Sequence, residues 1–339
     1  MMQVYHDHAM QEEAVFEFFF RDLPEQRNFL VACGLEQVIE NLHFSEDELH
    51  YLHEEGMFSE SFVESLRDFR FTGSIHGLSE GTIFFPGEPV LRVTAPIAEA
   101  QLVETRLINI LQFQTMIATK AARMSRIFPD KLLVDYGLRR AHGSEAGVMA
   151  ARASYIAGFA GTATVLAGKL FGIPIHGTMA HSLIQAHDSE REAFYRFAAS
   201  HPNNTVILLD TYDSLKATRE VVRLATELKK KGRTIRGVRI DSGDIVAISR
   251  SVREILDGNG LTDIKIFASG GLDEYSLAEF KQADAPIDGY GIGSKMTTSA
   301  DVPCYGSVYK LVEYAGLGPR KLSSNKATWP GRKQVFRNF

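Results

Sequence analysis

The pattern of apolar and polar positions becomes regular from about residue 130 onward. Short, uniformly apolar runs alternate there with stretches in which apolar residues recur at spacings of three and four. Such runs indicate buried parallel strands, and the stretches between them indicate amphipathic helices that cover a sheet. The runs are residues 132–134, 173–175, 206–209, 235–240, 264–268 and 287–292. This succession predicts an α/β fold with an irregular (β/α) barrel of parallel strands, and an open doubly wound sheet is the alternative.

Two of the predicted helices have recognisable ends. Residues 213–231 are followed by Gly232, and residues 244–257 are followed by Gly258. Glycine is common just after the last helical turn because it adopts a left-handed backbone without steric cost. These stretches are therefore predicted to be the connecting helices of the barrel.

The first part of the chain has shorter and more varied elements. Residues 15–20 favour a strand, residues 29–42 and 45–66 favour helices, and the glycine- and proline-rich residues 71–93 favour short strands and turns. Residues 98–124 have the apolar spacing of one long helix. We expect three segments: an N-terminal α+β domain with a long connecting helix (1–125), the barrel (126–305), and a C-terminal segment that returns to the N-terminal domain and is truncated (306–339).

Composition excludes several classes of protein. The 339 residues carry a formal charge of −5, which argues against nucleic acid or an anionic membrane as the main partner. The two cysteines, Cys33 and Cys304, lie far apart in the sequence and favour a reducing cytoplasm over secretion. The amino terminus is too polar for a signal peptide, and no apolar run reaches the ~18 residues of a membrane span. We therefore expect a cytoplasmic protein.

A polar or glycine-rich turn follows each apolar run. In parallel α/β folds these turns lie at one edge of the sheet, where ligands bind. Helix capping explains any one of these turns alone. Because all of them have polar residues at the same position relative to the preceding strand, together they predict a ligand site. The turns are DYGLRR at 135–140, HGTMAH at 176–181, DTYD at 210–213, RIDSGD at 239–244, SGGLD at 269–273 and GIGS at 291–294.

Two of these turns indicate phosphate binding. Ser269, Gly270 and Gly271 follow one strand, and Gly291 and Gly293 end the next. Glycines let backbone N–H groups approach an anion, and barrels often hold a phosphate after their last strands. Neither turn is a Walker loop, and the third glycine of a dinucleotide fingerprint is missing.

Charged residues gather in two other turns. Arg239, Asp241 and Asp244 place a cation and two carboxylates together, which suits magnesium beside a phosphate. The alternative is that Ser242 or Asp244 caps the next helix while Arg239 pairs with Asp241. Arg139 and Arg140 predict a bidentate clamp for an anion, with one solvated and one packed arginine as the alternative.

One histidine stands out from the others. His181 follows a strand-end turn and is predicted to begin a helix, where it could be a base, a nucleophile or a cap. His176, His181 and His187 have no zinc spacing with a third ligand, and His6 and His8 lie near a terminus.

Taken in this order, the turns resemble those of the nicotinate phosphoribosyltransferases of the type II phosphoribosyltransferase superfamily. The similar stretches are VDYGLRRAHG, GTMAHS, LLDTYD, GVRIDSGD, ASGGLDE and GYGIGS, supported by EGTIFFPGEPVLRV, ETRLINILQFQTMIATKAAR, GSVYKLVE and PGRKQVFR. Together they span nearly the whole chain. The resemblance implies that nicotinate and 5-phosphoribosyl 1-diphosphate are joined into nicotinate mononucleotide and diphosphate, with coupled ATP hydrolysis, as the first step of NAD salvage.

The resemblance also implies roles for individual residues. His181 would be transiently phosphorylated by ATP, and Asp241 and Asp244 would face the ribose or Mg²⁺. The substrates would be bound by Arg139, Arg140, Thr178, Arg239, Ser242, Gly243, Ser269, Gly270, Gly271, Gly291, Gly293 and Ser294. A homodimer with active sites at the subunit interface is implied as well.

Two features depart from the family pattern. Relatives carry a Thr-Asp-Leu-Tyr stretch before the segment that begins this chain, and they often continue beyond PGRKQVFR. We therefore expect a fragment or a late start codon, and a lower Michaelis constant for nicotinate when an upstream Asp-Leu-Tyr is restored. One alternative is a catalytically impaired homologue that binds ligand or pairs with a full-length subunit. Others are a nicotinamide or quinolinate phosphoribosyltransferase, and a flavin or sugar-phosphate barrel enzyme.

Overall fold

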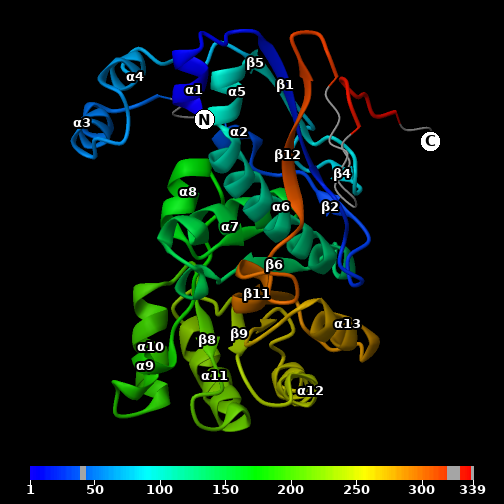
Figure 1. The fold of residues 1–339 in the computed structure, drawn as a ribbon. Helices are drawn as coiled ribbons and strands as arrows, with labels where there is room; N and C mark the ends of the chain where they lie inside the picture. Colours follow the sequence, from blue (N-terminus) through cyan, green and yellow to red (C-terminus); the bar gives the residue numbers. More distant parts are fainter. Residues whose placement is uncertain (39–42, 319–328, 337–339) are drawn as a thin grey trace. The chain divides into compact units, whose positions relative to one another are not determined.

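The structure is a computed structural model that describes residues 1–38, 43–318 and 329–336 (Figure 1). The chain forms two compact units. Met1–Thr119 and Val302–Phe339 make up the first, and Lys120–Asp301 makes up the second.

The first unit is built on an antiparallel sheet with the strand order β12-β1-β5-β3. The central strand β1 (Glu13–Phe20) pairs with both β5 (Leu91–Pro96) and β12 (Ser307–Tyr314). The edge strand β3 (Ser74–Gly77) pairs with β5. The C-terminal strand therefore completes a sheet that the N-terminal residues begin.

The helices of this unit are α1 (Met2–Asp7), α2 (Leu35–Val38), α3 (Glu46–Glu54), α4 (Glu60–Ser65), α5 (Ile97–Leu102) and the first part of α6 (Glu104–Ile127), whose residues from Lys120 onward belong to the second unit. They differ from the sequence prediction in three places. The stretch predicted as helical at 45–66 is divided into α3 and α4. The predicted helix 98–124 is interrupted at Val103, the C-cap of α5. The predicted helix 29–42 is wrong at its start, where Leu30–Val31 is strand β2, paired with β4 (Ile83–Phe84). Residues 39–42 of that prediction lie outside the described residues.

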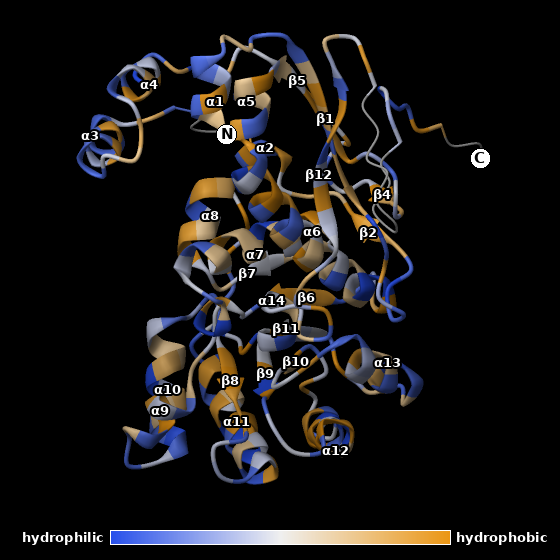
Figure 2. Cartoon of the chain, in the orientation of Figure 1, coloured by the Kyte–Doolittle hydropathy of each residue, from blue (hydrophilic) through white to orange (hydrophobic). Residues whose placement is uncertain are grey.

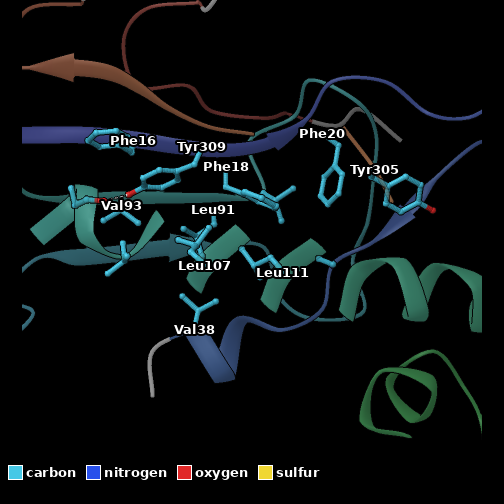
Figure 3. Packing of buried hydrophobic residues seen from close by; sticks show 14 of the residues in the cluster. Phe16, Phe18, Phe20, Val38, Leu91, Val93, Leu107, Leu111, Tyr305 and Tyr309 are labelled. Atoms are coloured by element: carbon cyan, nitrogen blue, oxygen red, sulfur yellow. Dashed lines mark hydrogen bonds between the residues drawn. The ribbon is translucent and has the colours of Figure 1, made fainter. Parts of the chain in front are cut away.

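Aromatic residues from both ends of the chain form the core of the first unit (Figure 3). Phe16 of β1 stacks on Tyr309 of β12 with ring centroids 4.7 Å apart. Leu107 and Leu111 of α6 are buried in the same cluster. Burial of these large side chains, each worth about 2 kcal/mol, stabilises the pairing of the C-terminal strand with the N-terminal one.

The second unit contains a parallel six-stranded sheet with the order β7-β6-β11-β10-β9-β8. Its strands are β6 (Leu132–Asp135), β7 (Gly161–Thr162), β8 (Val206–Leu208), β9 (Gly237–Ile240), β10 (Lys265–Ala268) and β11 (Gly289–Ile292). The prediction of an α/β fold with parallel strands beside a separate α+β part is confirmed. The run at 173–175 is the exception, because it contributes only an isolated bridge from Ile175 to Thr162.

Helices connect these strands. They are the 3-10 helix η1 (Leu138–Arg140), α7 (Ser144–Ile156), α8 (Val165–Phe171), α9 (His181–Gln185), α10 (Glu190–Ser200), α11 (Ser214–Lys229), α12 (Ile245–Asp257), α13 (Glu274–Gln282) and α14 (Ser294–Thr297). Apolar and polar residues occupy different faces of α11 and α12 (Figure 2), and the apolar faces bury Val221, Leu228 and Val252. Among the described residues, no helix is both long enough and apolar enough to cross a membrane.

The strand ladder of the second unit is interrupted at one place. The segment after Ile175 reaches β8 through side chains, with Thr178 Oγ1 donating to the carbonyl of Val206 at 3.2 Å and Asn204 Nδ2 donating to the carbonyl of Gly177 at 3.4 Å. The DTYD turn follows β8, so His181 at the start of α9 comes next to Thr211 of that turn.

Candidate active site

Side chains from two other turns lie against the ring of His181. Nδ1 of its ring lies 3.2 Å from Oγ1 of Thr211, and Nε2 lies 3.7 Å from Oδ2 of Asp241. The His181 side chain is 39% exposed, so solvent or a ligand can reach it. A hydroxyl on one nitrogen and a carboxylate near the other orient an imidazole for nucleophilic or acid–base chemistry.

Arg239 extends this cluster toward β10. Its Nη2 donates to the carbonyl of Met179 at 2.9 Å, and its Nη1 lies 3.5 Å from Oδ1 of Asp241 and 3.4 Å from Oγ of Ser269. Ser269 Oγ in turn donates to Oδ1 of Asp241. The Nε–H of Arg239 is buried and has no hydrogen-bond partner among the described residues, so this guanidinium donor is unsatisfied.

Tyr136 belongs to the same cluster although the sequence analysis did not single it out. Burial raises the pKa of its phenol, while the charge of Arg239 opposes the rise and that of Asp241 adds to it. A Cβ atom placed on Gly291 would lie 2.4 Å from the Tyr136 ring. The sequence feature that could have indicated Tyr136 is its position directly after Asp135, the buried last residue of β6.

Asp135 fixes the turn that carries Tyr136. Its Oδ1 accepts from the N–H of Gly137 and its Oδ2 from the hydroxyl of Thr162, each at 2.7 Å. The side chain is fully buried, and burial raises the pKa of its carboxyl against the opposing effect of these two hydrogen bonds. Asp135 therefore joins the end of β6 to β7.

The glycine turns require glycine for steric reasons. Gly270 has φ +95°, and a Cβ there would lie 1.9 Å from the carbonyl oxygen of Asp241. A Cβ on Gly293 would lie 3.1 Å from the carbonyl oxygen of Tyr136. Both turns thus pass close to the strand ends that carry the polar cluster. Gly271, at φ +66°, has open space on its Cβ side.

Several predicted residues lie outside the central cluster. Arg139 and Arg140 are exposed in η1, Ser294 is exposed at the start of α14, and Gly243 is exposed with φ +84°. Ser242 Oγ donates to Asp210 Oδ2. Thr178 contacts β8, as described above.

The carboxylates do not form a ready-made metal site. Asp244 Oδ1 accepts from the N–H of Ala247 as the N-cap of α12, which was the capping alternative for this residue. Oδ1 of Asp241 already accepts from Ser269. In the described part of the chain, no group of three histidine, cysteine, aspartate or glutamate residues is placed to hold a metal ion. The shared magnesium site expected for Asp241 and Asp244 stays a prediction, because magnesium binds few protein ligands and keeps several waters.

Comparison with known proteins gives matches along nearly the whole chain. Residues 1–112 match the nicotinate phosphoribosyltransferase N-terminal domain, and residues 132–310 match the nicotinate phosphoribosyltransferase family. The chain is 46% identical to nicotinate phosphoribosyltransferase pncB2 of Mycobacterium tuberculosis, an alignment that covers 100% of this chain and 73% of that protein. It is 43% identical to nicotinate phosphoribosyltransferase of Bacillus subtilis, covering 98% of this chain and 69% of the relative.

Solved structures give similar matches. The human nicotinic acid phosphoribosyltransferase superposes with a TM-score of 0.86 at 28% identity, covering 98% of this chain and 76% of the human one. A nicotinate-nucleotide pyrophosphorylase from Pyrococcus furiosus superposes with a TM-score of 0.78 at 27% identity, covering 98% of this chain and 77% of that one.

Proposed function

The chain belongs to the nicotinate phosphoribosyltransferase family, and we propose from this that it joins nicotinate to 5-phosphoribosyl 1-diphosphate. The products are nicotinate mononucleotide and diphosphate. The observation that carries the proposal is the meeting of Arg239, Tyr136 and His181 around Asp241 at the carboxyl ends of β6 and β9 and at the start of α9.

Nicotinate is an aromatic ring with a carboxylate, and the cluster offers a group for each part. Arg239 has a buried Nε–H without a partner and is only 12% exposed, which suits a charge-assisted hydrogen bond to a carboxylate. The Tyr136 ring, whose pKa is affected by the charge of Arg239, is proposed as the aromatic surface for the base. Nicotinamide lacks the negative charge that Arg239 favours, so nicotinate is the preferred base.

The two glycine turns are proposed to hold the phosphorylated sugar. Ser269, Gly270 and Gly271 precede α13, and Gly291 and Gly293 precede α14. Backbone N–H groups in such turns bind phosphate oxygens without a side chain in the way. The exposed Arg139, Arg140 and Ser294 are proposed as further contacts for the phosphates.

The transfer breaks the C1–O bond of the ribose, and the leaving diphosphate takes the bonding electron pair. The pyridine nitrogen of nicotinate then donates its own pair to C1. Positive charge develops on the ribosyl group as the bond breaks, so a carboxylate such as Asp241 nearby lowers the barrier. Holding both reactants in one orientation lowers it further.

ATP is proposed to phosphorylate His181. Since Nδ1 is engaged by Thr211, Nε2 is the nitrogen placed to attack the terminal phosphorus of ATP, with ADP leaving. The added negative charge would change the affinity of the site for the diphosphate and so couple ATP hydrolysis to turnover. We also propose that magnesium enters the site bound to the substrate phosphates. The protein is proposed to be a homodimer located in the cytoplasm.

The test is formation of the mononucleotide by the purified protein. Nicotinate, nicotinamide and quinolinate are compared with 5-phosphoribosyl 1-diphosphate, each with and without ATP. We expect turnover with nicotinate, stimulated by ATP, and at least about tenfold lower kcat/KM with nicotinamide, since one lost ion-pair contact is worth about 1.4 kcal/mol. A preference for quinolinate or nicotinamide would contradict the assigned substrate, and binding of 5-phosphoribosyl 1-diphosphate without turnover would indicate an impaired homologue.

A further inference from the structure

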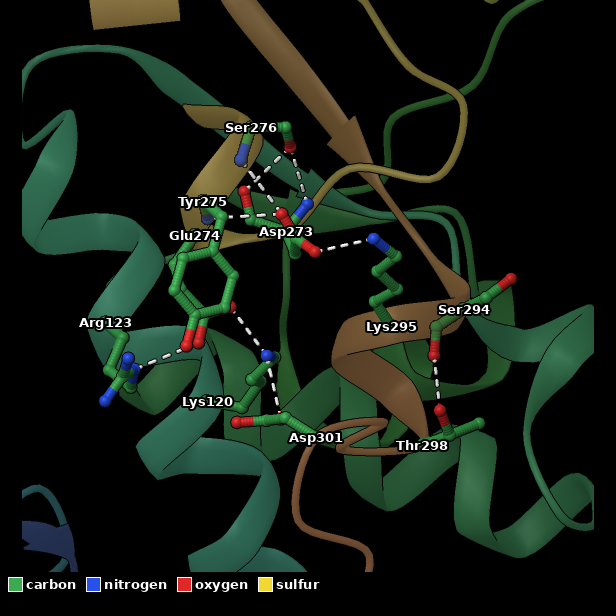
Figure 4. A network of polar contacts seen from close by, with 10 residues as sticks. All are labelled: Lys120, Arg123, Asp273, Glu274, Tyr275, Ser276, Ser294, Lys295, Thr298 and Asp301. Atoms are coloured by element: carbon green, nitrogen blue, oxygen red, sulfur yellow. Dashed lines mark hydrogen bonds and ion pairs between the residues drawn. The ribbon is translucent and has the colours of Figure 1, made fainter. Parts of the chain in front are cut away.

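A buried lysine joins the two ends of the second unit. Lys120 Nζ lies 2.6 Å from Oε2 of Glu274 and 2.8 Å from Oδ1 of Asp301 (Figure 4). Lys120 is the first residue of this unit and Asp301 is the last. The Lys120 side chain is only 2% exposed, and a cation buried to this degree requires such partners.

Glu274, the partner of Lys120, is the first residue of α13. Arg123 Nε adds a second cation at 3.0 Å from Oε1 of Glu274. The Glu274 side chain is 5% exposed, so its position is set by these contacts rather than by solvent. The first turn of α13 is therefore fixed to the points where the chain enters and leaves the unit.

Asp273, the neighbouring carboxylate, connects α13 to the other glycine turn. Its Oδ1 accepts from the N–H groups of Tyr275 and Ser276, and its Oδ2 accepts from Lys295 Nζ at 2.6 Å (Figure 4). Lys295 lies in α14, which starts directly after Gly293. The adjacent residues Asp273 and Glu274 thus place two ion-paired groups at the start of α13: a half-exposed pair with Lys295 and a buried group with Lys120 and Arg123.

We propose that Lys120 and Glu274 are positioning residues for binding of the sugar phosphate. This rests on the proposed function, because it takes the turns at Ser269–Gly271 and Gly291–Gly293 as the phosphate site. Neither Lys120 nor Glu274 touches the substrate. They act by holding the start of α13, and with it the N–H groups of the preceding turn, in the orientation that binds phosphate.

The test compares Glu274→Gln, which keeps the shape but removes the charge, with the wild type. We expect KM for 5-phosphoribosyl 1-diphosphate to rise about tenfold, because a small misplacement of binding groups has effects of this size. KM for nicotinate should change less, by about twofold at most, since Arg239 and Tyr136 are in other turns and Arg239 is also held by the carbonyl of Met179.

A second variant and a control separate the positioning role from a general loss of stability. Asp301→Asn leaves the Lys120–Glu274 pair in place and should give a smaller rise in the same KM, so it serves if Glu274→Gln does not fold. The control is Lys281→Met, near the other end of α13, whose Nζ donates to the carbonyl of Ile127. It should leave both KM values unchanged. Thermal unfolding of all variants is measured alongside.

Calorimetric binding of ribose 5-phosphate separates this proposal from the proposed function. Weaker binding in Glu274→Gln than in the wild type and Lys281→Met supports the positioning role, even if the wild type forms no mononucleotide. Equal ribose 5-phosphate affinity in the wild type and a folded variant overturns it. So does an equal rise in both KM values, which is what general destabilisation would give.

Discussion

His181 and Asp241 face each other across 3.7 Å at the start of α9 and the end of β9. The sequence alone leaves several possible roles open for His181. Its partner Asp241 also accepts a hydrogen bond from Ser269. A histidine in this setting is no longer explained by capping alone, since α9 has no side-chain cap at Ala180 and the ring points to Thr211 and Asp241. The predictions below start from this pair.

Replacing His181 by alanine tests its proposed phosphorylation. We expect His181→Ala to lose the ATP-stimulated part of mononucleotide formation while keeping a slower ATP-independent reaction, because Arg239 and the glycine turns remain. The measurement is the initial rate with and without ATP. His187→Ala is the matched control, since the ring Nδ1 of His187 bonds to the carbonyl of Leu183 in the preceding turn of the chain and not to Thr211 or Asp241. Full ATP stimulation in His181→Ala would refute the assigned role.

Thr211→Val tests the orientation of the same ring. Valine has nearly the shape of threonine but cannot hydrogen-bond to Nδ1 of His181. Loss of one such bond is worth about 1 kcal/mol, so we expect ATP-dependent kcat to fall about fivefold. Thr211→Ser keeps the hydroxyl and should retain most of the rate. Equal rates in the valine and serine variants would mean that the hydroxyl does not orient His181.

Gly270→Ala tests the close approach of two strand ends. The new Cβ would lie 1.9 Å from the carbonyl oxygen of Asp241, so the backbone must move. We expect a loss of unfolding free energy of more than about 2 kcal/mol together with weaker binding of ribose 5-phosphate. Gly271→Ala meets no atom within 4 Å and should lose only about 1 kcal/mol, the cost of its positive φ. Urea unfolding of both variants checks the order, which the opposite ranking would contradict.

The buried Asp135 predicts a specific pH dependence of stability. Its folded pKa is raised above the unfolded value of about 3.9, so the native state binds the proton more tightly than the unfolded state. The stability that this adds is complete below about pH 3.9 and is lost as pH rises through the folded pKa. Asn does not titrate, so Asp135→Asn removes this loss of stability at higher pH. Unfolding free energies of both proteins between pH 4 and 7 should therefore shift in favour of the variant as pH rises, and a constant difference would show that Asp135 does not titrate in this way.

The sequence was sufficient for much of the fold because the apolar runs of the second unit are buried on both faces. β9 and β10 begin within two residues of the predicted runs. The strand at Gly161–Thr162 was missed because it is two residues long and begins with glycine, so it has no apolar run. The break between α5 and α6 was missed because Val103 fits the apolar spacing and is buried in the core.

The candidate site was predictable in its turns but not in its partners. His181 and Ser269 were found because each lies in a turn after a predicted strand, and Arg239 because it lies at the end of one. Tyr136 and Thr211 were not, because an aromatic or a hydroxyl near a strand end has many structural uses. Only the fold brings Thr211 to His181 and places Tyr136 where the charge of Arg239 affects its pKa, since these residues belong to different turns.

The interruption of the ladder between Ile175 and β8 has a consequence for how the site can move. Displacing β9 or β10 would break backbone hydrogen bonds to neighbours on both sides. The stretch from Gly177 to His181 is fastened to β8 by side-chain bonds from Thr178 and Asn204, which can re-form after a shift. A shift of this stretch would therefore break side-chain bonds rather than a strand ladder, so we expect the imidazole to be able to move relative to a bound phosphoryl group without disrupting β9 and β10.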